Sequence, residues 1–289
     1  MSATSAPDAT RRIEFHKLHG CGNDFIFIDN RTLQLPREHM AQWATVLCQR
    51  AFSIGADGLI FLEAPAPAPG CDYRWHFFNA DGSRAEMCGN ASRCAASLAV
   101  RLDLAGPAHR FLTDAGPILA QVLEESPAGA RVKVQLTAPH DLWLGEPLTL
   151  NGTTYTVNHV NTGVPHAVVI VDDVWSVDVK TLGRALRHHE RFAPKGANAN
   201  FIQILNSTTI HLRTYERGVE DETYACGTGA AASALVAQQL GFAASEVNIT
   251  TTGKEVLTIT SDGGQVFLTG AAAYVFAGVL DARALGLPL

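Results

Sequence analysis

Two cysteines of this sequence stand in nearly the same local pattern, and the pattern is one that activates a thiol. Residues 79–91 read NADGSRAEMCGNA and residues 217–230 read RGVEDETYACGTGA, so Cys88 and Cys226 are each followed by glycine and an almost uncharged segment. The first turn of a helix has unpaired backbone N–H groups and a partial positive charge, which lower the pKa of a thiol from about 8.5 toward neutrality. Both cysteines are therefore predicted to be polarised thiols at helix N-termini.

The same two turns can hold a carboxylate. Helix N-termini bind anions, and a glycine lets a ligand approach the backbone closely. The residues of these turns are Gly89 and Asn90 in one motif and Gly227 and Thr228 in the other. Two thiols facing one carboxylate suit inversion at the adjacent carbon, because one thiolate can remove the α-proton while the opposite thiol protonates the other face. The helix N-terminal donors then stabilise the charge that develops on the carboxylate.

The other cysteines indicate no chemistry of their own. Cysteine is among the most buried residue types, so Cys48, Cys71 and Cys94 are predicted to be small core residues, and Cys21 in HGCGND has no assigned role. The gap from Cys88 to Cys94 is wider than the usual zinc-ligand spacing, and no suitably spaced histidine pair follows. The sequence also has no phosphate loop and no clear pyridoxal-type lysine environment. A reaction without metal or cofactor is the simplest prediction.

Composition excludes several classes of protein. The 289 residues include 22 Lys and Arg against 28 Asp and Glu, a net charge of −6, whereas binding to nucleic acid or to an anionic membrane requires a basic face. Hydrophobic residues make up 47% of the chain, which predicts a large core and excludes disorder for most of it. No apolar stretch reaches the roughly 20 residues of a membrane span, and no secretory signal core follows the first residues. A cytoplasmic protein with reduced thiols is expected.

The elements that must position the two cysteines form two similar halves. Residues 90–100 are Ala-rich with Arg93 as the only charge, and residues 227–240 carry no charge, which is typical of helices buried on every side. Few helices separate the other elements, so the sheets should be mostly antiparallel. The predicted strands include residues 25–29, 73–78, 118–123, 131–136, 167–171, 201–205, 210–215, 247–251, 255–260 and 272–279. The predicted class is α+β, with two pseudo-symmetric halves, each a mostly antiparallel sheet wrapped around a central buried helix.

The sequence also predicts the limits of these halves. Residues 1–12 are expected to be a disordered tail, and residues 64–70, where Ala and Pro alternate before a glycine, an exposed loop. One half-domain should comprise residues 13–128 and 272–289 and carry Cys88. The other should comprise residues 129–271 and carry Cys226. They meet near residues 127–130, a stretch rich in Pro, Gly and Ala.

Four segments resemble the diaminopimelate epimerase family. They are HGCGNDFIFID at 19–29, FNADGSRAEMCGNASRCAA at 78–96, NTGVPHAVV at 161–169 and RTYERGVEDETYACGTGAAASA at 213–234. The resemblance covers essentially the whole chain from about residue 13, in family order. It implies the diaminopimelate epimerase-like fold, with two pseudo-symmetric halves and the active site between them, and a homodimer. It also implies cofactor-free interconversion of LL- and meso-diaminopimelate in the synthesis of lysine and peptidoglycan precursors.

The resemblance assigns roles by motif position. The catalytic residues that it implies are Cys88, Cys226, His166 and Glu216. The residues that it implies for substrate binding are Asn23, Asn79, Gly89, Asn90, Asn198, Arg217, Gly227 and Thr228. In this assignment the cysteines are the acid/base pair, and the two Cys-Gly turns hold the reacting carboxylate. His166 and Glu216 assist the thiols and contact an amine, while Arg217 and the asparagines bind the far carboxylate.

Two positions depart from the commonest family pattern, and two other functions stay open. Val164 stands where many members have asparagine, and Gly58 replaces a glutamine of some members. An epimerase or racemase of another amino acid on the same fold would not need the cation of Arg217 for a distal carboxylate. A two-cysteine redox protein would have no reason to catalyse hydrogen exchange at a substrate α-carbon.

Overall fold

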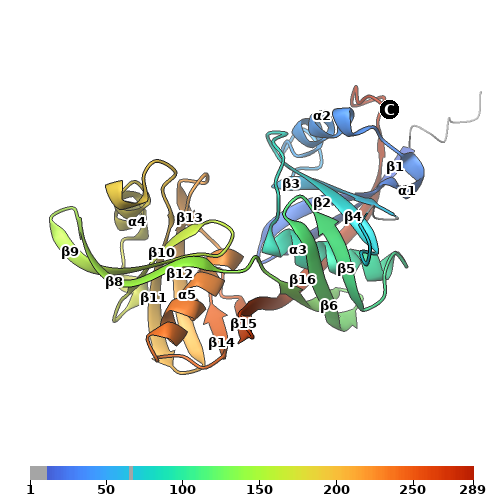
Figure 1. The fold of residues 1–289 in the computed structure, drawn as a ribbon. Coiled ribbons are helices and arrows are strands. Elements are labelled where there is room, and N and C mark those ends of the chain that lie inside the picture. Colours follow the sequence, from blue (N-terminus) through green and yellow to red (C-terminus); the bar gives the residue numbers. More distant parts are fainter. Residues whose placement is uncertain (1–11, 65–67) are drawn as a thin grey trace, which may run out of the picture. The chain divides into compact units, whose positions relative to one another are not determined.

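The computed structural model describes residues 12–64 and 68–289, which fold into two compact units. Unit 1 comprises the described residues of Met1–Val132 together with Ala271–Leu289, and unit 2 is Lys133–Gly270. The chain passes between them within β7 (Gly129–Gln135) and within β16 (Gln265–Asp281). In Figure 1, blue to green and dark red colours mark unit 1, and yellow-green to orange colours mark unit 2.

Two predictions concern residues outside this description. Residues 1–11 of the expected tail and residues 65–67 of the expected loop lie outside the described residues. Arg12, expected in the tail, is instead the first residue of β1 (Arg12–Gly20), where it pairs with Asp281. The strand starts earlier than its apolar run because the long partner strand β16 offers backbone hydrogen-bonding groups there, which the sequence of β1 does not reveal.

The strands of unit 1 form a sheet that closes on itself. Its strands, in order, are β1, β2 (Asn23–Asp29), β3 (Gly58–Glu63), β4 (Tyr73–Asn79), β5 (Ala108–Thr113), β6 (Gly116–Ser126), β7 and β16. β1 pairs with β16, which completes the ring. β2–β3 and β4–β5 are parallel, whereas β1–β2, β3–β4 and β5–β6 are antiparallel. Closure removes exposed strand edges and surrounds α3 (Gly89–Arg101) with strands, as Figure 1 shows.

Unit 2 repeats the same order of strands. Its strands, in order, are β16, β15 (Val256–Asp262), β14 (Glu246–Thr250), β12 (Thr209–Glu216), β11 (Asn198–Asn206), β10 (Pro165–Ile170), β9 (Thr153–Asn161) and β8 (His140–Leu150), with β13 (Asp221–Thr223) beside β12. β10–β11 and β12–β14 are parallel, whereas β9–β10, β11–β12 and β14–β15 are antiparallel. α5 (Gly227–Gln239) connects β12 to β14 as α3 connects β4 to β5.

The remaining helices fit the same repeat. α1 (Asn30–Leu33) and α2 (Arg37–Leu47) connect β2 to β3. The 3-10 helix η2 (Val174–Ser176), α4 (Val179–Arg187) and the 3-10 helix η3 (Glu190–Phe192) connect β10 to β11. Helices α2 and α4 each cover a hydrophobic core of their unit. The predicted α+β class with two pseudo-symmetric, mostly antiparallel halves is therefore confirmed.

Both helices that follow a Cys-Gly motif are buried, as predicted. All residues of α3 from Gly89 to Ala99 are buried, and between Gly227 and Ala237 of α5 only Thr228 and Leu235 are partly accessible. Small side chains allow strands to approach such a helix on every side, which explains the alanine content. Cys88 and Cys226 are the N-cap residues of α3 and α5 and have extended backbone angles, with φ −146° and −119°.

Several strands were not predicted. β3 is a short run of almost wholly buried apolar residues, a pattern that periodicity alone does not assign to a strand or a helix. β8 contains Gly145 and Pro147, which disfavour strands, and its pairing with β9 is irregular between His140 and Glu146. A strand at the end of a sheet tolerates such residues because only one of its edges is paired.

Gly58 provides a test of the packing at the start of β3. A Cβ atom there would lie 2.6 Å from a ring carbon of Phe77 and 2.9 Å from the carbonyl oxygen of Phe78. We expect Gly58→Ala to lower the free energy of unfolding by about 1–3 kcal/mol, because the backbone contact cannot be relieved by a rotamer change. Gly106→Ala is the control, since nothing lies within 4 Å of its Cβ position. Urea unfolding measures both, and equal stabilities would contradict the packing argument.

Candidate active site

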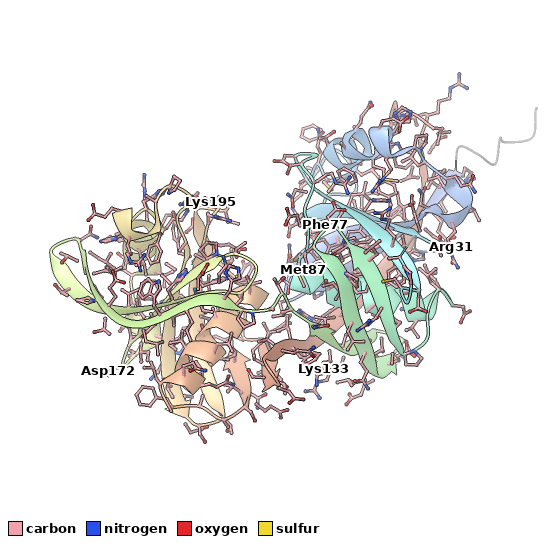
Figure 2. All side chains as sticks on the ribbon, viewed as in Figure 1. Arg31, Phe77, Met87, Lys133, Asp172 and Lys195 are labelled. Carbon is pink, nitrogen blue, oxygen red and sulfur yellow. The ribbon has the colours of Figure 1, made fainter. Side chains whose placement is uncertain are left out.

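Cys88 lies where the chain enters α3, directly after Met87, which Figure 2 labels. Its side chain is half-buried, and its Sγ donates to Oδ1 of Asn23 at 3.8 Å. Asn23 is the first residue of β2, and its Oδ1 also accepts from Nδ2 of Asn90 at 3.3 Å. Three of the predicted site residues of unit 1 therefore meet around one amide oxygen.

A buried arginine orders this group, and its role was missed at the sequence level. Arg93 is fully buried in α3, and its guanidinium donates to Oδ1 of Asn90 at 3.0 Å. It also donates to acceptors of Gly89, Ala271 and Cys21. A buried guanidinium is costly unless its donors are satisfied. The signal was present, because Arg93 is the only charged residue of α3 before its last residue, Arg101.

The glycine-rich turn of HGCGND makes room for this arginine. A Cβ atom at Gly20 would lie 2.9 Å from the Arg93 guanidinium. Cys21 has a φ of +57° and Gly22 a φ of +79°, so the turn uses the left-handed region. The Cys21 thiol lies against the Arg93 guanidinium at 3.3 Å. Cys21 therefore belongs to the support of Arg93, which answers the open question of its place in the structure.

Asp57 holds the other side of Asn23. Its Oδ2 accepts from Nδ2 of Asn23 at 2.7 Å, and its Oδ1 pairs with Arg50 at 2.9 Å. Asp24, next to Asn23, is paired with both Lys17 and Arg50. Burial opposes ionisation of Asp24, but these two cations outweigh it and lower the pKa of Asp24. The network places two ion-paired carboxylates beside the start of β2.

Asn79 is placed apart from the hydrogen bonds around Cys88. It is the last residue of β4, and its side chain donates to Oγ of Ser83 at 3.0 Å within the following turn. In register it lies opposite Gly58 on β3. Its role in substrate binding stays a prediction.

The predicted core cysteines differ in burial. Cys48 and Cys94 are buried, and burial raises the pKa of Cys48 to about 12. Cys71 is only half-buried, in the turn before β4, so the core prediction is wrong for it. Burial of cysteine is a statistical tendency, and a turn residue has fewer neighbours than a residue inside an element.

Cys226 has a different set of contacts in unit 2. It is buried, and its Sγ accepts from the backbone N–H of Gly229 at 3.4 Å. Nδ2 of Asn198 donates to the same sulfur at 3.9 Å, and Oγ1 of Thr228 lies 3.4 Å from it. Oδ1 of Asn198 in turn accepts from the backbone N–H of Arg217 at 2.8 Å. The structure thus brings Cys226, Thr228, Asn198 and the backbone of Arg217 together.

Glu216 and Arg217 end β12 and begin the turn after it. Burial raises the pKa of Glu216 above its ordinary value. The Arg217 guanidinium donates to the carbonyl oxygen of Lys195 at 3.5 Å. Among the ion pairs of the described residues, none joins Glu216 to Arg217. These two neighbouring side chains therefore do not neutralise each other through a salt bridge.

His166 is a neutral, fully buried hydrogen-bond donor. Burial lowers its pKa to about 3, with smaller contributions from His159 and Arg217. Nδ2 of Asn200 lies 3.1 Å from Nδ1 of His166 and also donates to the carbonyl oxygen of Ala167. Because a carbonyl only accepts, the amide nitrogen must face both groups, and Nδ1 of His166 must accept. The ring proton is therefore on Nε2, which has no partner among the described residues.

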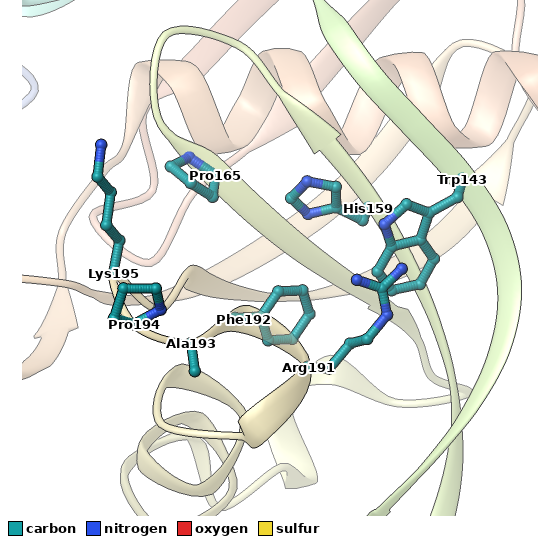
Figure 3. A pocket seen from close by; sticks show the side chains of 9 residues that line it. Trp143, His159, Pro165, Arg191, Phe192, Ala193, Pro194 and Lys195 are labelled. Carbon is teal, nitrogen blue, oxygen red and sulfur yellow. The ribbon is translucent and has the colours of Figure 1, made fainter.

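A pocket in unit 2 adjoins this group, because it is lined by Lys195, whose carbonyl oxygen accepts from Arg217, and by Pro165, the neighbour of His166. Trp143, His159, Arg191 and Phe192 line it with Pro165 and residues 193–196, as Figure 3 shows. The His159 ring stacks on Trp143 with centroids 5.2 Å apart, and Arg191 lies over Trp143. None of the predicted site residues lines it, so this pocket is not the place where the thiol chemistry was predicted.

Within residues 12–64 and 68–289, no group of three or more His, Cys, Asp or Glu side chains could hold a metal ion. No helix of the same residues is long and apolar enough to cross a membrane.

Comparison with known proteins identifies the family. The model of the diaminopimelate epimerase family matches residues 15–140 and 158–275. The chain is 47% identical over 282 residues to the diaminopimelate epimerase of Aquifex aeolicus (strain VF5), covering 94% of this chain and 99% of the relative. It is 44% identical to the diaminopimelate epimerase of Hydrogenobaculum sp. (strain Y04AAS1), covering 92% and 97%. This chain belongs to the diaminopimelate epimerase family.

The family assignment agrees with the fold. A crystal structure of a Bacillus anthracis phenazine biosynthesis protein of the PhzF family is similar to this chain with a TM-score of 0.69. The identity is 15%, and the match covers 93% of this chain and 99% of that one. At this identity the likeness concerns the fold alone. In this diaminopimelate epimerase family member, the two departing residues are part of the framework: Gly58 is a packing position, and Val164 lies half-buried in the turn before β10.

The buried neutral state of His166 predicts a pH dependence of stability. The unfolded chain binds a proton at His166 below pH 6.5, whereas the folded chain does not do so until about pH 3. Acid therefore favours unfolding, and each pH unit below 6.5 costs up to about 1.4 kcal/mol. We expect His166→Gln to flatten the loss of stability between these limits in chemical unfolding at several pH values. The exposed-site control His140→Gln should keep the slope of the parent. An unchanged slope in His166→Gln would show that His166 is not buried as a neutral group.

Proposed function

We propose that this chain interconverts LL- and meso-2,6-diaminopimelate, with Cys88 and Cys226 as the two acid/base groups. One observation carries the proposal: in each of two repeated units, the N-cap residue of a helix buried over most of its length is a cysteine followed by glycine. The names of the relatives at 47% and 44% identity supply the substrate.

The proposed step is a balanced transfer of one proton. A thiolate takes the proton from the α-carbon, and the electron pair of the C–H bond moves onto the carboxylate oxygens. The opposite thiol then gives its proton to the other face of the carbon, so one cysteine ends protonated and the other ionised. The mechanism requires both thiols to reach one α-carbon. It uses no cofactor, because the negative charge is stabilised by hydrogen-bond donors.

The first turns of α3 and α5 supply these donors. A helix leaves its first N–H groups without helical acceptors, so the backbone of Gly89, Asn90, Gly227 and Thr228 offers them to the reacting carboxylate. The N-terminal ends of two helix dipoles add to the stabilisation of the dianionic intermediate. Burial of both helices strengthens this interaction, because little water screens it.

Three further side chains match the charged groups at the two ends of diaminopimelate: His166, Glu216 and Arg217. The Nε2–H of His166 is a donor, so we assign it to a carboxylate or thiolate rather than to proton abstraction. Glu216 offers a partly buried acceptor to an ammonium group. The fork of donors on Arg217 suits the distal carboxylate, with the amides of Asn23, Asn79 and Asn198 as further contacts. A homodimer, a cytoplasmic location and a role in lysine and peptidoglycan precursor synthesis belong to the same proposal and rest on the family.

The reaction is tested by incubating the protein with LL-diaminopimelate in deuterated water under reducing conditions. We expect α-deuterated meso product, and Cys88→Ala and Cys226→Ala should each lower kcat/KM by about 100- to 10,000-fold, the usual contribution of a positioned acid or base. Cys71→Ala, outside both helix starts, should retain the parent rate. Absence of exchange in the parent protein would refute the function and favour the two-cysteine redox alternative.

Arg217 separates diaminopimelate from other amino acids. We expect Arg217→Gln to raise KM for diaminopimelate by about tenfold or more, because a charge-assisted contact to a carboxylate contributes roughly 1.5–3 kcal/mol. Arg217→Lys should recover part of the loss. If a monocarboxylic amino acid were epimerised as efficiently by the parent and Arg217→Gln did not change its KM, the alternative substrate class would be favoured.

A further inference from the structure

The two units place an asparagine near the thiol from different strands. In unit 1, Phe25 of β2 pairs with Gly58, the first residue of β3. Asn23 lies two residues before Phe25. In unit 2, His166 of β10 pairs with Asn198, the first residue of β11. The residue two positions before His166, equivalent to Asn23, is Val164. Each unit therefore has an asparagine at only one of these two positions. Unit 1 has Asn23 on the first strand and Gly58 on the second, whereas unit 2 has Val164 before the first strand and Asn198 on the second.

Fixed charges determine which end of Asn23 faces Cys88. The carboxylate of Asp57 only accepts, so the NH₂ group of Asn23 must point to it. On the other side, the Arg93 guanidinium only donates, so Oδ1 of Asn90 faces Arg93 and its NH₂ group faces Asn23. Both constraints turn Oδ1 of Asn23 toward the Cys88 sulfur at 3.8 Å. The hydrogen bonds from Arg93 through Asn90 and Asn23 to Asp57 therefore allow only one orientation of the two side-chain amides.

The opposite end of an amide faces Cys226. The backbone N–H of Arg217 donates to Oδ1 of Asn198, so the NH₂ group of Asn198 must face the Cys226 sulfur. The backbone N–H of Gly229 donates to the same sulfur at 3.4 Å. An N–H donor stabilises a thiolate, whereas a carbonyl oxygen stabilises the S–H of a thiol.

We infer that the substrate-free protein carries its proton on Cys88 and its negative charge on Cys226, and that Asp57 and Arg93 are positioning residues that impose this state through Asn23. Both cysteines are helix N-caps, but only the Cys226 sulfur accepts from a backbone N–H of its own helix, which acts in the same direction as the amides. The inference deepens the proposed function, on which it rests.

Other charged or titratable groups lie near the amides that contact the two cysteines. Near Cys88, Arg50, Asp24 and Lys17 form a paired network with Asp57. Near Cys226, Glu216 and Arg217 adjoin the backbone that holds Asn198, and His166 is neutral. In the resting form Cys226 takes the α-proton and Cys88 gives one. After one turnover Cys226 is protonated and Cys88 is ionised. The enzyme regains its resting form by a turnover in the opposite direction or by proton exchange with water.

The ultraviolet absorbance of thiolates in the substrate-free protein at neutral pH tests the resting state. The double variant Cys88→Ser/Cys226→Ser gives the baseline. We expect Cys88→Ser to keep the signal above this baseline and Cys226→Ser to lose it. The reverse order, equal losses, or no difference between the parent and the double variant would overturn the inference.

Asp57 is tested in the Cys226→Ser background, where Cys88 is the thiol of interest. Asp57→Asn can donate as well as accept, so Asn23 is free to turn its NH₂ group to Cys88. We expect the thiolate-to-thiol ratio of Cys88 to rise about fivefold to tenfold, the effect of one hydrogen bond. Arg50→Gln removes the ion pair of Asp57 but leaves Asn23 bonded, so it should leave the ratio unchanged. A rise in both variants, or in neither, would exclude the positioning role.

These outcomes are independent of the epimerase test. The absorbance needs no substrate, so a protein that exchanges deuterium but ionises Cys88 first would keep the proposed function and lose this inference. Thermal unfolding of Asp57→Asn and Arg50→Gln checks that both fold equally.

Discussion

A helix that is buried over most of its length and has a cysteine as its N-cap is the constraint on which the rest of this structure depends. The first N–H groups of such a helix have no helical acceptors and little access to water, so they must face a ligand, a side chain or a thiol. In α5 one of them, from Gly229, is used by Cys226 itself. The strands around each helix, the parallel crossovers before and after it, and the small side chains on its surface all serve to bury it, including the first turn of α3.

Burial of a charge follows from the same constraint. Arg93 lies on a helix with no solvent-facing side over its first eleven residues, so its guanidinium must find acceptors inside unit 1. It finds them on the helix, in the turn at Cys21 and on β16. Removing such acceptors from a buried charge is strongly destabilising, which ties the geometry of three chain segments together. The turn HGCGND is therefore both a support for Arg93 and the origin of Asn23.

Duplication gives the two units one topology, but the contacts of their thiols are not duplicated. The paired strands β2–β3 and β10–β11 offer equivalent positions, and different ones hold the asparagine in each unit. Two-base inversion requires opposite protonation of two chemically identical groups. In the resting state that we infer, the exchanged amides supply that difference.

The sequence by itself determined the features that are local or periodic. The two Cys-Gly helix starts, the burial of both helices, the α+β class and the repeat follow from spacing, residue size and lack of charge, and the family follows from four short motifs. The predicted functional roles of the site residues stay predictions. Only the tertiary structure decided the partners of these residues. Asp57 lies far in sequence from Asn23, and Asn200 from His166, so no local pattern reveals which side-chain atoms meet. A hydrogen bond has a direction, and the direction of an amide is set by what stands at both of its ends; those ends are brought together by folding.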